Sequence, residues 1–353
     1  MIALRSIWSH IDKFLAAILL TVAVAAITPA RGEAATAVGW LADAAIVLLF
    51  FLHGAKLSSQ EALVGARQWR LHVMVFLGTF ALFPLLGISA RFLAPNFLPA
   101  PLWAGVILLT ALPSTVQASI VFTSVAGGNV PAAMCSATAS SLLGVVLTPL
   151  IAGLLLSSHG LDISVHSILG IVMQLVLPFA AGQILRRWIG NYLTRHPRVL
   201  GSVDYGSILI LVYAAFSHGV VDGIWHQIGA GDLFKVALVD IALLAAVMTI
   251  LTFGSRQLGF SRADEITVVF CGSKKSLVNG LPIAALLFAG HAGLVILPLM
   301  LFHQAQLMVC ASLARYYAAH RNYGERVVSG SPANLGLSLR YDLVQSNQQS
   351  RDR

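Results

Sequence analysis

Two adjacent lysines, Lys274 and Lys275, lie near the middle of an apolar stretch that runs from Val268 to Phe288. A lysine at the centre of a membrane helix costs at least ~2.5 kcal/mol on insertion scales, and charges at that depth mark substrate or ion pathways. At about 1.5 Å per residue, the pair lies ~12–15 Å inside the predicted helix 265–289, too deep for easy snorkelling. Neighbouring residues on a helix point about 100° apart, so we expect one lysine to enter a cavity and the other to cap free carbonyls. The alternative is that both lysines only hold two broken helices together.

Polar residues and helix breakers accompany the lysines, and a similar set occurs in the predicted helix 102–125. A broken helix exposes free N–H groups at one end and free C=O groups at the other, which is tolerated in a membrane only around a cavity. Such ends bind anions and cations. The expected breakers are Pro113, Gly272, Gly280 and Pro282. The expected substrate- or ion-binding residues are Ser114, Thr115, Gln117, Ser119, Ser273, Lys274, Lys275, Ser276 and Asn279.

A few further polar residues lie inside apolar segments. Asp43 and Asp240 are possible counter-ions for the lysines, although both could equally line a shallow vestibule. Gln304 is expected to line the same site. The run of small residues 135–141, "CSATASS", is expected to serve close helix packing rather than ligand binding.

Composition places the chain among polytopic membrane proteins, with the lipid bilayer as its environment. Of its 353 residues 58% are hydrophobic and only 10% charged, whereas soluble domains carry about 25% charged residues. The net charge of +8 is attributed to cytoplasmic loops and not to nucleic-acid binding. The chain has no metal-ligand, phosphate-loop or nucleophile–base motif, so we expect neither an enzyme nor a cofactor nor a metal site.

The elements that must position these residues are ten predicted all-α membrane spans. They lie at 14–28, 38–54, 71–93, 102–125, 130–156, 164–187, 206–222, 233–254, 265–289 and 292–317. Eleven Lys and Arg residues fall on the side of the N-terminus before the tail, against three on the other side. Both termini are therefore predicted to be cytoplasmic. Residues 321–353 form a polar tail that is predicted to be disordered.

An internal repeat relates the two halves of the chain. "IVLLFFLHG" at 46–54 aligns with "LVYAAFSHG" at 211–219 at an offset of 165, and Arg91 then falls on Arg256. Five spans separate the paired segments, and an odd number inverts the second copy. Residues 1–163 and 164–320 are thus predicted to be two inverted five-helix repeats, in which the interrupted fourth and ninth helices cross near the midplane.

The two interrupted segments, "LPSTVQASIVFTSVAGGNVPAAMCSATAS" and "CGSKKSLVNGLPIA", resemble the bile acid:sodium symporter superfamily. They are most similar to its SBF-like branch, the bacterial relatives of the seventh vertebrate bile acid cotransporter. The resemblance implies a core domain of spans 3–5 and 8–10 and a panel domain of spans 1, 2, 6 and 7. It also implies a substrate crevice between these domains, alternating access, and location in the bacterial inner (plasma) membrane.

The departures from that family concern the residues that bind sodium. Sodium-coupled members carry an acidic residue and a Gln-Asn pair in the ninth span, where this chain has Cys271, Lys275 and Ser276. In the fourth span Ser119 matches a serine, but Ile120 replaces an asparagine. A lysine ammonium supplies no oxygen ligand for sodium. It would instead occupy the space that the sodium ion fills in those relatives. Since lysine loses its proton more readily away from water, it could serve as a fixed or a titrating charge.

We therefore predict a secondary active transporter for a small amphipathic organic anion, with lysine in place of a degraded sodium site and with either the proton or sodium as the coupling ion. One alternative is a sodium-coupled symporter of bile-acid-like or other carboxylates. A second alternative is a membrane regulator of ion homeostasis that translocates nothing.

Overall fold

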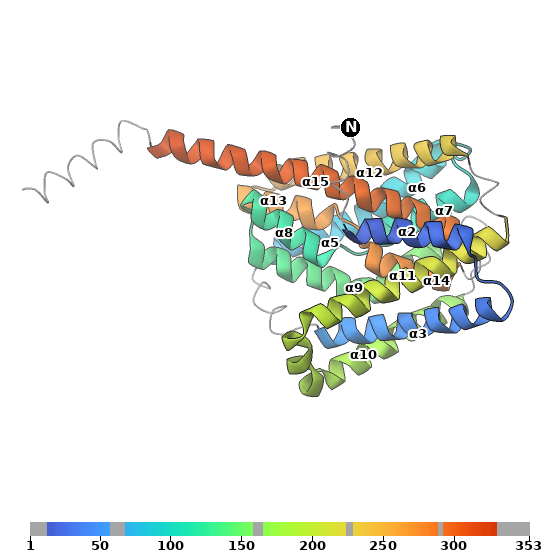
Figure 1. Cartoon of the computed structure of the whole chain (residues 1–353). Coiled ribbons are helices and arrows are strands. Elements are labelled where there is room, and N and C mark those ends of the chain that lie inside the picture. Colours follow the sequence, from blue (N-terminus) through green and yellow to red (C-terminus); the bar gives the residue numbers. More distant parts are fainter. Residues whose placement is uncertain (1–12, 57–67, 158–164, 224–228, 289–291, 330–353) are drawn as a thin grey trace, which may run out of the picture.

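The computed structural model describes residues 13–56, 68–157, 165–223, 229–288 and 292–329. Within these ranges the chain is helical and contains no β-strand. Most helices run side by side along one direction, and α15 extends beyond the others at one end (Figure 1). The prediction of an all-α membrane protein is confirmed at this level.

Each predicted span coincides with one helix or with a broken helix. The first half contains α2 (Lys13–Ile27), α3 (Glu33–Lys56), α5 (Trp69–Leu77), η1 (Gly78–Leu82), α6 (Phe83–Leu93), α7 (Ala100–Ala111), α8 (Val116–Ala126) and α9 (Val130–Ser157). The second half contains α10 (Val165–Arg195), α11 (Pro197–Val221), α12 (Ala230–Gln257), α13 (Arg262–Gly272), α14 (Leu277–Leu287) and α15 (Ala292–Ser329). Since α15 continues to Ser329, the predicted polar tail begins as helix, and residues 330–353 lie outside the described residues.

Seven of these segments are long and apolar enough to cross a membrane by themselves. They are α3, the continuous run α5–η1–α6, α9, α10, α11, α12 and α15. A further candidate is the pair α7 and α8, whose axes differ by 62° at a short break. The number of ten spans and their inverted repeat remain predictions.

Two glycines allow α3 and α10 to pack closely. A Cβ atom on Gly54 would collide with the carbonyl oxygen of Phe179, and one on Gly182 would collide with that of Phe51. The two backbones therefore touch at both points, as expected where small residues lie between membrane helices. Helix α3 also packs on α11, and α11 packs on α2.

The centre of the molecule is formed by the broken helices. All residues of α7 from Leu102 to Ala111 are buried, as are those of α13 from Glu265 to Gly272. Most of α14 is buried as well. A helix that is apolar on every side belongs in the interior, which accounts for the burial of α7 and of the apolar second half of α13.

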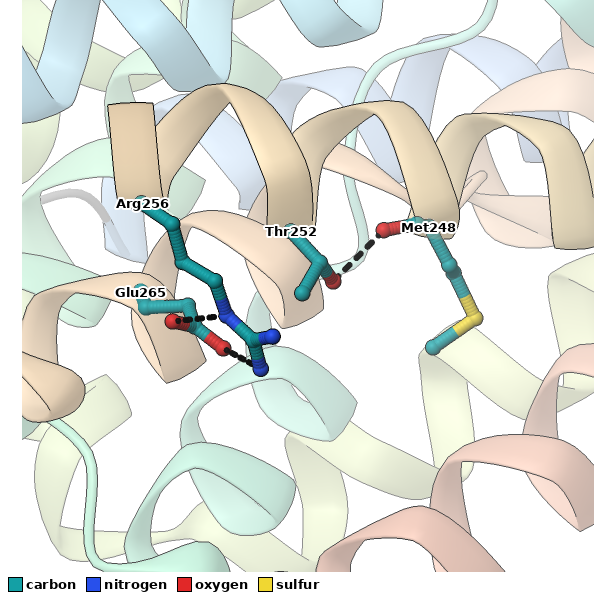
Figure 2. Close-up of polar contacts among 4 residues, drawn as sticks. All are labelled: Met248, Thr252, Arg256 and Glu265. Atoms are coloured by element: carbon teal, nitrogen blue, oxygen red, sulfur yellow. Dashed lines mark hydrogen bonds and ion pairs between the residues drawn. The ribbon is translucent and has the colours of Figure 1, made fainter. Parts of the chain in front are cut away.

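One ion pair joins α12 to α13 near the end of their connection. The guanidinium of Arg256 donates from Nε to Oε2 of Glu265 at 3.0 Å, and a second N–H bonds Oε1 at 3.1 Å (Figure 2). The pair is bidentate, and Glu265 is buried. Such fork-to-fork pairs are the geometrically specific class of ion pair. The Arg256–Glu265 pair holds the first turn of α13 against α12. It thereby sets the direction in which α13 runs toward the centre of the molecule.

The second break lies at residues 273–276, between Gly272 and Leu277. Gly280 and Pro282 were predicted to break the helix, but both lie inside α14, so that part of the prediction is wrong. Ser276 begins α14 by accepting a hydrogen bond from the N–H of Asn279, and this cap determines where the helix starts. Gly280 instead makes room for its neighbours, because a Cβ there would press against Leu112.

Candidate functional site

The two helix breaks touch each other through their backbones. The N–H of Ser276 donates to the carbonyl oxygen of Pro113 at 2.9 Å. Helix α7 ends at Ala111 because the residue before a proline disfavours the helical conformation, and Leu112 is accordingly extended. Thr148 of α9 donates from Oγ1 to the freed carbonyl of Ala111 at 2.9 Å. The carbonyls at the end of α7 are thus bonded by neighbouring elements.

Lys275 takes up the remaining free carbonyls at this point. Its Nζ donates to the carbonyl oxygens of Thr110 at 2.7 Å, Leu112 at 2.8 Å and Thr79 at 2.7 Å. An ammonium has three N–H donors, so all of them are used by three backbone acceptors. The side chain is 1% exposed, and Nζ also lies 4.3 Å from the ring centre of Phe83. Lys275 is therefore the lysine that caps carbonyls.

The third carbonyl is available because of the π-helical turn η1. In this turn the N–H of Phe83 bonds to the oxygen of Gly78, five residues earlier. The corresponding donor to Thr79 would be Pro84, which has no N–H. The oxygen of Thr79 is therefore left for Lys275. A π-turn of this kind is common at functional sites.

The peptide of Lys275 is held as firmly as its side chain. The amide of Gln306 on α15 accepts from the Lys275 N–H and donates to the Lys275 carbonyl, both at 2.9 Å. Gln306 also lies 3.1 Å from Nδ1 of His303, one turn away on the same helix. Two hydrogen bonds to one extended peptide hold the broken segment in a single orientation.

Lys274 points to a different part of the site. Its Nζ donates to the carbonyl oxygen of Ala118 in α8 at 2.7 Å and lies 4.1 Å from the ring centre of Phe122 and 5.2 Å from that of Phe270. Cation–π contacts of this length stabilise a desolvated ammonium. Lys274 is completely buried, so neither lysine projects into an open space in this conformation. The expectation that one of them enters a cavity is wrong for this state.

The hydroxyls of the fourth span form a small cluster beside the break. Ser114 Oγ lies 3.2 Å and Thr115 Oγ1 lies 3.5 Å from Ser119 Oγ, which donates to the carbonyl of Phe270 at 3.3 Å. Three of the four residues predicted in this span, Ser114, Thr115 and Ser119, lie together. Gln117 is exposed and does not join them.

Of the predicted polar residues of the ninth span, some form hydrogen bonds at the break and others do not. Asn279 donates to Ser141 Oγ at 3.2 Å, and Ser276 caps α14. Ser273 Oγ is buried and has no hydrogen-bond partner. The predicted participation of Gln304 is not observed, because its Oε1 has no partner and Gln306 contacts the break instead.

A cavity of about 210 Å³ that is open on one side lies between α5 and α9, next to the first break. Its polar lining is His72, Ser136 and Ser140, and the rest is apolar. His72 Nδ1 lies 2.7 Å from Ser136 Oγ. Ser140 Oγ accepts from the backbone N–H of Ser114 at 3.0 Å, so the cavity wall is directly bonded to the break.

Neither predicted counter-ion pairs with a lysine. Asp43 lies on α3 with an exposed side chain, and Asp240 is fully buried in α12. Both carboxylate oxygens of Asp240 lack a hydrogen-bond partner. The predicted pairing is wrong, because the two ammonium groups are satisfied by backbone carbonyls instead.

Comparison with known proteins assigns the chain to a family. The model of the SBF-like CPA transporter family matches residues 12–319. An uncharacterised protein of Pseudomonas aeruginosa is 49% identical over 324 residues, which is 91% of this chain and 97% of that protein.

The chain belongs to the SBF-like CPA transporter family. A putative symporter, YfeH, of Escherichia coli is 48% identical over 308 residues, or 87% of this chain and 93% of that protein. Sodium/bile acid cotransporter 7 of Xenopus tropicalis is 29% identical over 313 residues, which is 84% of this chain and 89% of that protein. The resemblance drawn from the sequence is confirmed. The protein is a multi-span membrane protein of a transporter family, not an enzyme.

Within this SBF-like chain, sequence reasoning missed the residues that support the breaks from other helices. Three serines of the run 135–141, which was expected only to pack closely, also form hydrogen bonds to His72, Ser114 and Asn279. Gln306 shares a helix face with His303, three residues earlier. That spacing was the available signal for Gln306, since residues three apart on a helix are neighbours.

Proposed function

We propose that the protein is a secondary active transporter that moves a small amphipathic organic anion by alternating access and has no sodium site at its helix crossing. The observation that carries the proposal is the contact of the Lys275 ammonium with the backbone oxygens of Thr79, Thr110 and Leu112 at 2.7–2.8 Å. Freed carbonyls of this kind are the natural cation ligands of a broken membrane helix. A covalently attached cation already holds them.

The charge of the crossing favours an anion as the substrate. Lys274 and Lys275 bring two ammonium groups into the interior. The acids buried among the described residues are Glu265, which pairs with Arg256, and Asp240, which pairs with neither lysine. A buried positive charge without a counter-ion is costly, and a bound carboxylate or sulfonate would relieve that cost when the crevice opens.

The apolar cavity between α5 and α9 supports an amphipathic ligand. Its size, about 210 Å³, and its mainly apolar wall suit a hydrocarbon portion. Ser140 connects this wall to the backbone of the break at Ser114. A ligand could place its apolar part in the cavity and its charged group toward the hydroxyls and the lysines.

The packing of the helices supports a division into two moving parts. Helix α3 packs on α10 and α11, and α11 packs on α2; these four helices correspond to the panel domain that the family resemblance implies. The broken pairs with α5–α6, α9, α12 and α15 would form the core. In this proposal there are ten spans in two inverted repeats, with both termini on the cytoplasmic side of the inner membrane, and the substrate crosses between panel and core.

A sodium-coupled symporter is the second candidate, because several relatives are named sodium/bile acid cotransporters. If sodium is the coupling ion, it must bind away from the carbonyls that Lys275 occupies. The two candidates therefore differ in one measurable property, the dependence of uptake on a sodium gradient.

The test is uptake by the full-length protein in proteoliposomes. Taurocholate and a panel of small carboxylates are first screened for thermal stabilisation of the detergent-solubilised protein, since a ligand of the folded state stabilises it by mass action. Uptake of the stabilising anion is then measured with an inward sodium gradient and with potassium in its place. We expect equal initial rates. A rate that scales with the sodium gradient would refute the proposal.

Two variants connect the assay to the crossing. Lys275→Met should abolish uptake, because it releases the carbonyls that hold the broken helices in register. Lys274→Met is the matched control, because it also removes one buried ammonium. This variant should still fold and should bind the anion more weakly. Full uptake by both variants would remove the lysines from the mechanism, and binding without uptake by the wild type would favour a regulator.

A further inference from the structure

The structure contains one buried acid that the proposed function does not use. Asp240 lies in α12 and is completely buried, and neither of its carboxylate oxygens has a hydrogen-bond partner. The other buried acid among the described residues, Glu265, is held by the two bonds from Arg256. Asp240 is therefore the exception that needs an explanation.

Its position rules out contact with water at either end of the helix. Asp240 follows Ala230, the first residue of α12, by ten positions and precedes Gln257, the last, by seventeen. At about 1.5 Å per residue, it lies ~15 Å and ~25 Å from the two ends. No other ionisable residue occurs between Lys235 and Arg256.

No group on the packed helices compensates its charge. Helix α12 packs against α13, α15, α6, α7 and η1. None of the ionisable residues described on these elements bonds to Asp240, namely Arg91, Arg262, Asp264, Glu265, Cys271, His303, Cys310, Arg315, Tyr316, Tyr317 and His320. A carboxylate ion without a partner in such surroundings is far too costly to persist, and the group takes up a proton instead. Asp240 is thus a neutral carboxylic acid in this conformation.

A neutral, unbonded acid contributes nothing to the fold that an apolar residue would not contribute better. Intramembrane acids that lack a structural partner serve ion or proton transfer by default. Lys275 is less suited to this part, because backbone carbonyls engage all three of its donors in this conformation. A proton that is exchanged during transport therefore needs another residue to bind it. Asp240 is suited to this, because it is a buried acid without a hydrogen-bond partner.

We propose that Asp240 is the proton-binding site that couples transport to a proton gradient. Its carboxylate takes up one proton from water in the open state, is neutral in the closed state described here, and releases the proton when the other side opens. This inference rests on the proposed transport function. A proton that enters with a monovalent anion would make each transport step electrically neutral.

The first test does not require a substrate. Infrared difference spectra of the full-length protein in lipid nanodiscs are recorded at neutral pH, with exchange into heavy water to identify the C=O stretch of a protonated carboxyl group. We expect a band from a buried carboxylic acid in the wild type and its loss in Asp240→Asn. The matched control is Asp43→Asn, which changes an exposed acid on α3 and should keep the band. A band that survives in Asp240→Asn, or its absence from the wild type, would overturn the proposal.

The second test separates coupling from transport. Uptake of labelled taurocholate, or of whichever anion stabilises the protein, is measured with an inward proton gradient and also as exchange without any gradient. Asp240→Asn should lose the accumulation that the gradient drives and keep the exchange, whereas Asp43→Asn should keep both. Accumulation that persists in Asp240→Asn would refute the coupling role. If the wild type transports none of the anions, the proposed function fails, and the infrared result alone decides whether Asp240 binds a proton.

Discussion

Replacement of Lys275 by methionine should destabilise the protein far more than the same replacement at Lys274. Methionine is unbranched and similar in length, so it keeps most of the packing and removes the ammonium. Both lysines are buried and adjacent in the chain. The pair therefore provides an internal control in which the residue type, depth and substituent are the same and only the contacts differ.

The expected magnitude follows from the carbonyls that each change leaves behind. Lys275→Met leaves three buried carbonyls, those of Thr79, Thr110 and Leu112, without their donor. An unsatisfied buried acceptor costs about 1–3 kcal/mol. Taking about 2 kcal/mol for each gives a loss of about 6, and removal of a central lysine returns about 3 kcal/mol. We expect a net loss of about 3 kcal/mol in the free energy of unfolding.

Lys274→Met leaves no such deficit. Ala118 lies within α8, where its carbonyl also has the helical donor four residues on, at Phe122. The change removes one hydrogen bond and a cation–π contact, together about 2–3 kcal/mol, and returns about 3 kcal/mol from the buried charge. The free energy of unfolding should therefore change by less than about 1 kcal/mol.

The assay can use the protein's own cysteines. Cys135, Cys271 and Cys310 are buried and form no disulfide, so a thiol-reactive fluorescent dye labels them only as the protein unfolds. Unfolding is followed in detergent as a function of temperature and of added denaturant for the wild type and both variants. If Lys275→Met is as stable as Lys274→Met, the carbonyls do not depend on the ammonium, and the account of the crossing given above is wrong.

Two further substitutions test the supporting contacts by the same labelling assay. Gln306→Leu should lower the free energy of unfolding by about 2 kcal/mol, because the peptide of Lys275 loses two hydrogen bonds, whereas Gln304→Leu should lower it by less than about 0.5 kcal/mol. Equal effects of the two glutamine changes would contradict the assignment. Gly182→Ala should cost about 1–3 kcal/mol, because the new methyl group meets the backbone of α3. The matched change Gly170→Ala adds a methyl group where nothing lies within 4 Å, and it should stabilise the protein by up to about 1 kcal/mol, because alanine favours the helix over glycine.

The position of the first break could be predicted because proline acts locally. Pro113 prevents the residue before it from continuing a helix, and the structure ends α7 just before that residue, at Ala111. Pro282 did not act in this way. It lies in the second turn of α14, which begins at the cap formed by Ser276, and a capped start leaves most of the helix intact despite one missing donor.

The contacts of the lysines could not be predicted, because they depend on elements far away in the chain. The oxygen of Thr79 becomes available only through the π-turn of η1 combined with Pro84. That turn leaves no pattern in the hydrophobic periodicity, since apart from Thr79 its residues are apolar or glycine. Similarly, Asp43 and Asp240 look equivalent in the sequence. They differ because Asp43 faces outward on α3, whereas Asp240 lies on the buried face of α12 with Val236 and Leu243.

The use of a lysine at the crossing has a consequence for how energy can be coupled to transport. A bound sodium ion both holds freed carbonyls together and can leave, so one ligand provides structure and driving force. A lysine whose three donors are all engaged provides only the structure, since it cannot dissociate and has no free acceptor through which to exchange a proton. The two roles must then lie on different residues. Asp240 carries no structural bond, and its charge can change at the cost of one proton. The separation predicts that variants of Lys275 fail by unfolding, whereas variants of Asp240 remain folded and fail only to accumulate substrate.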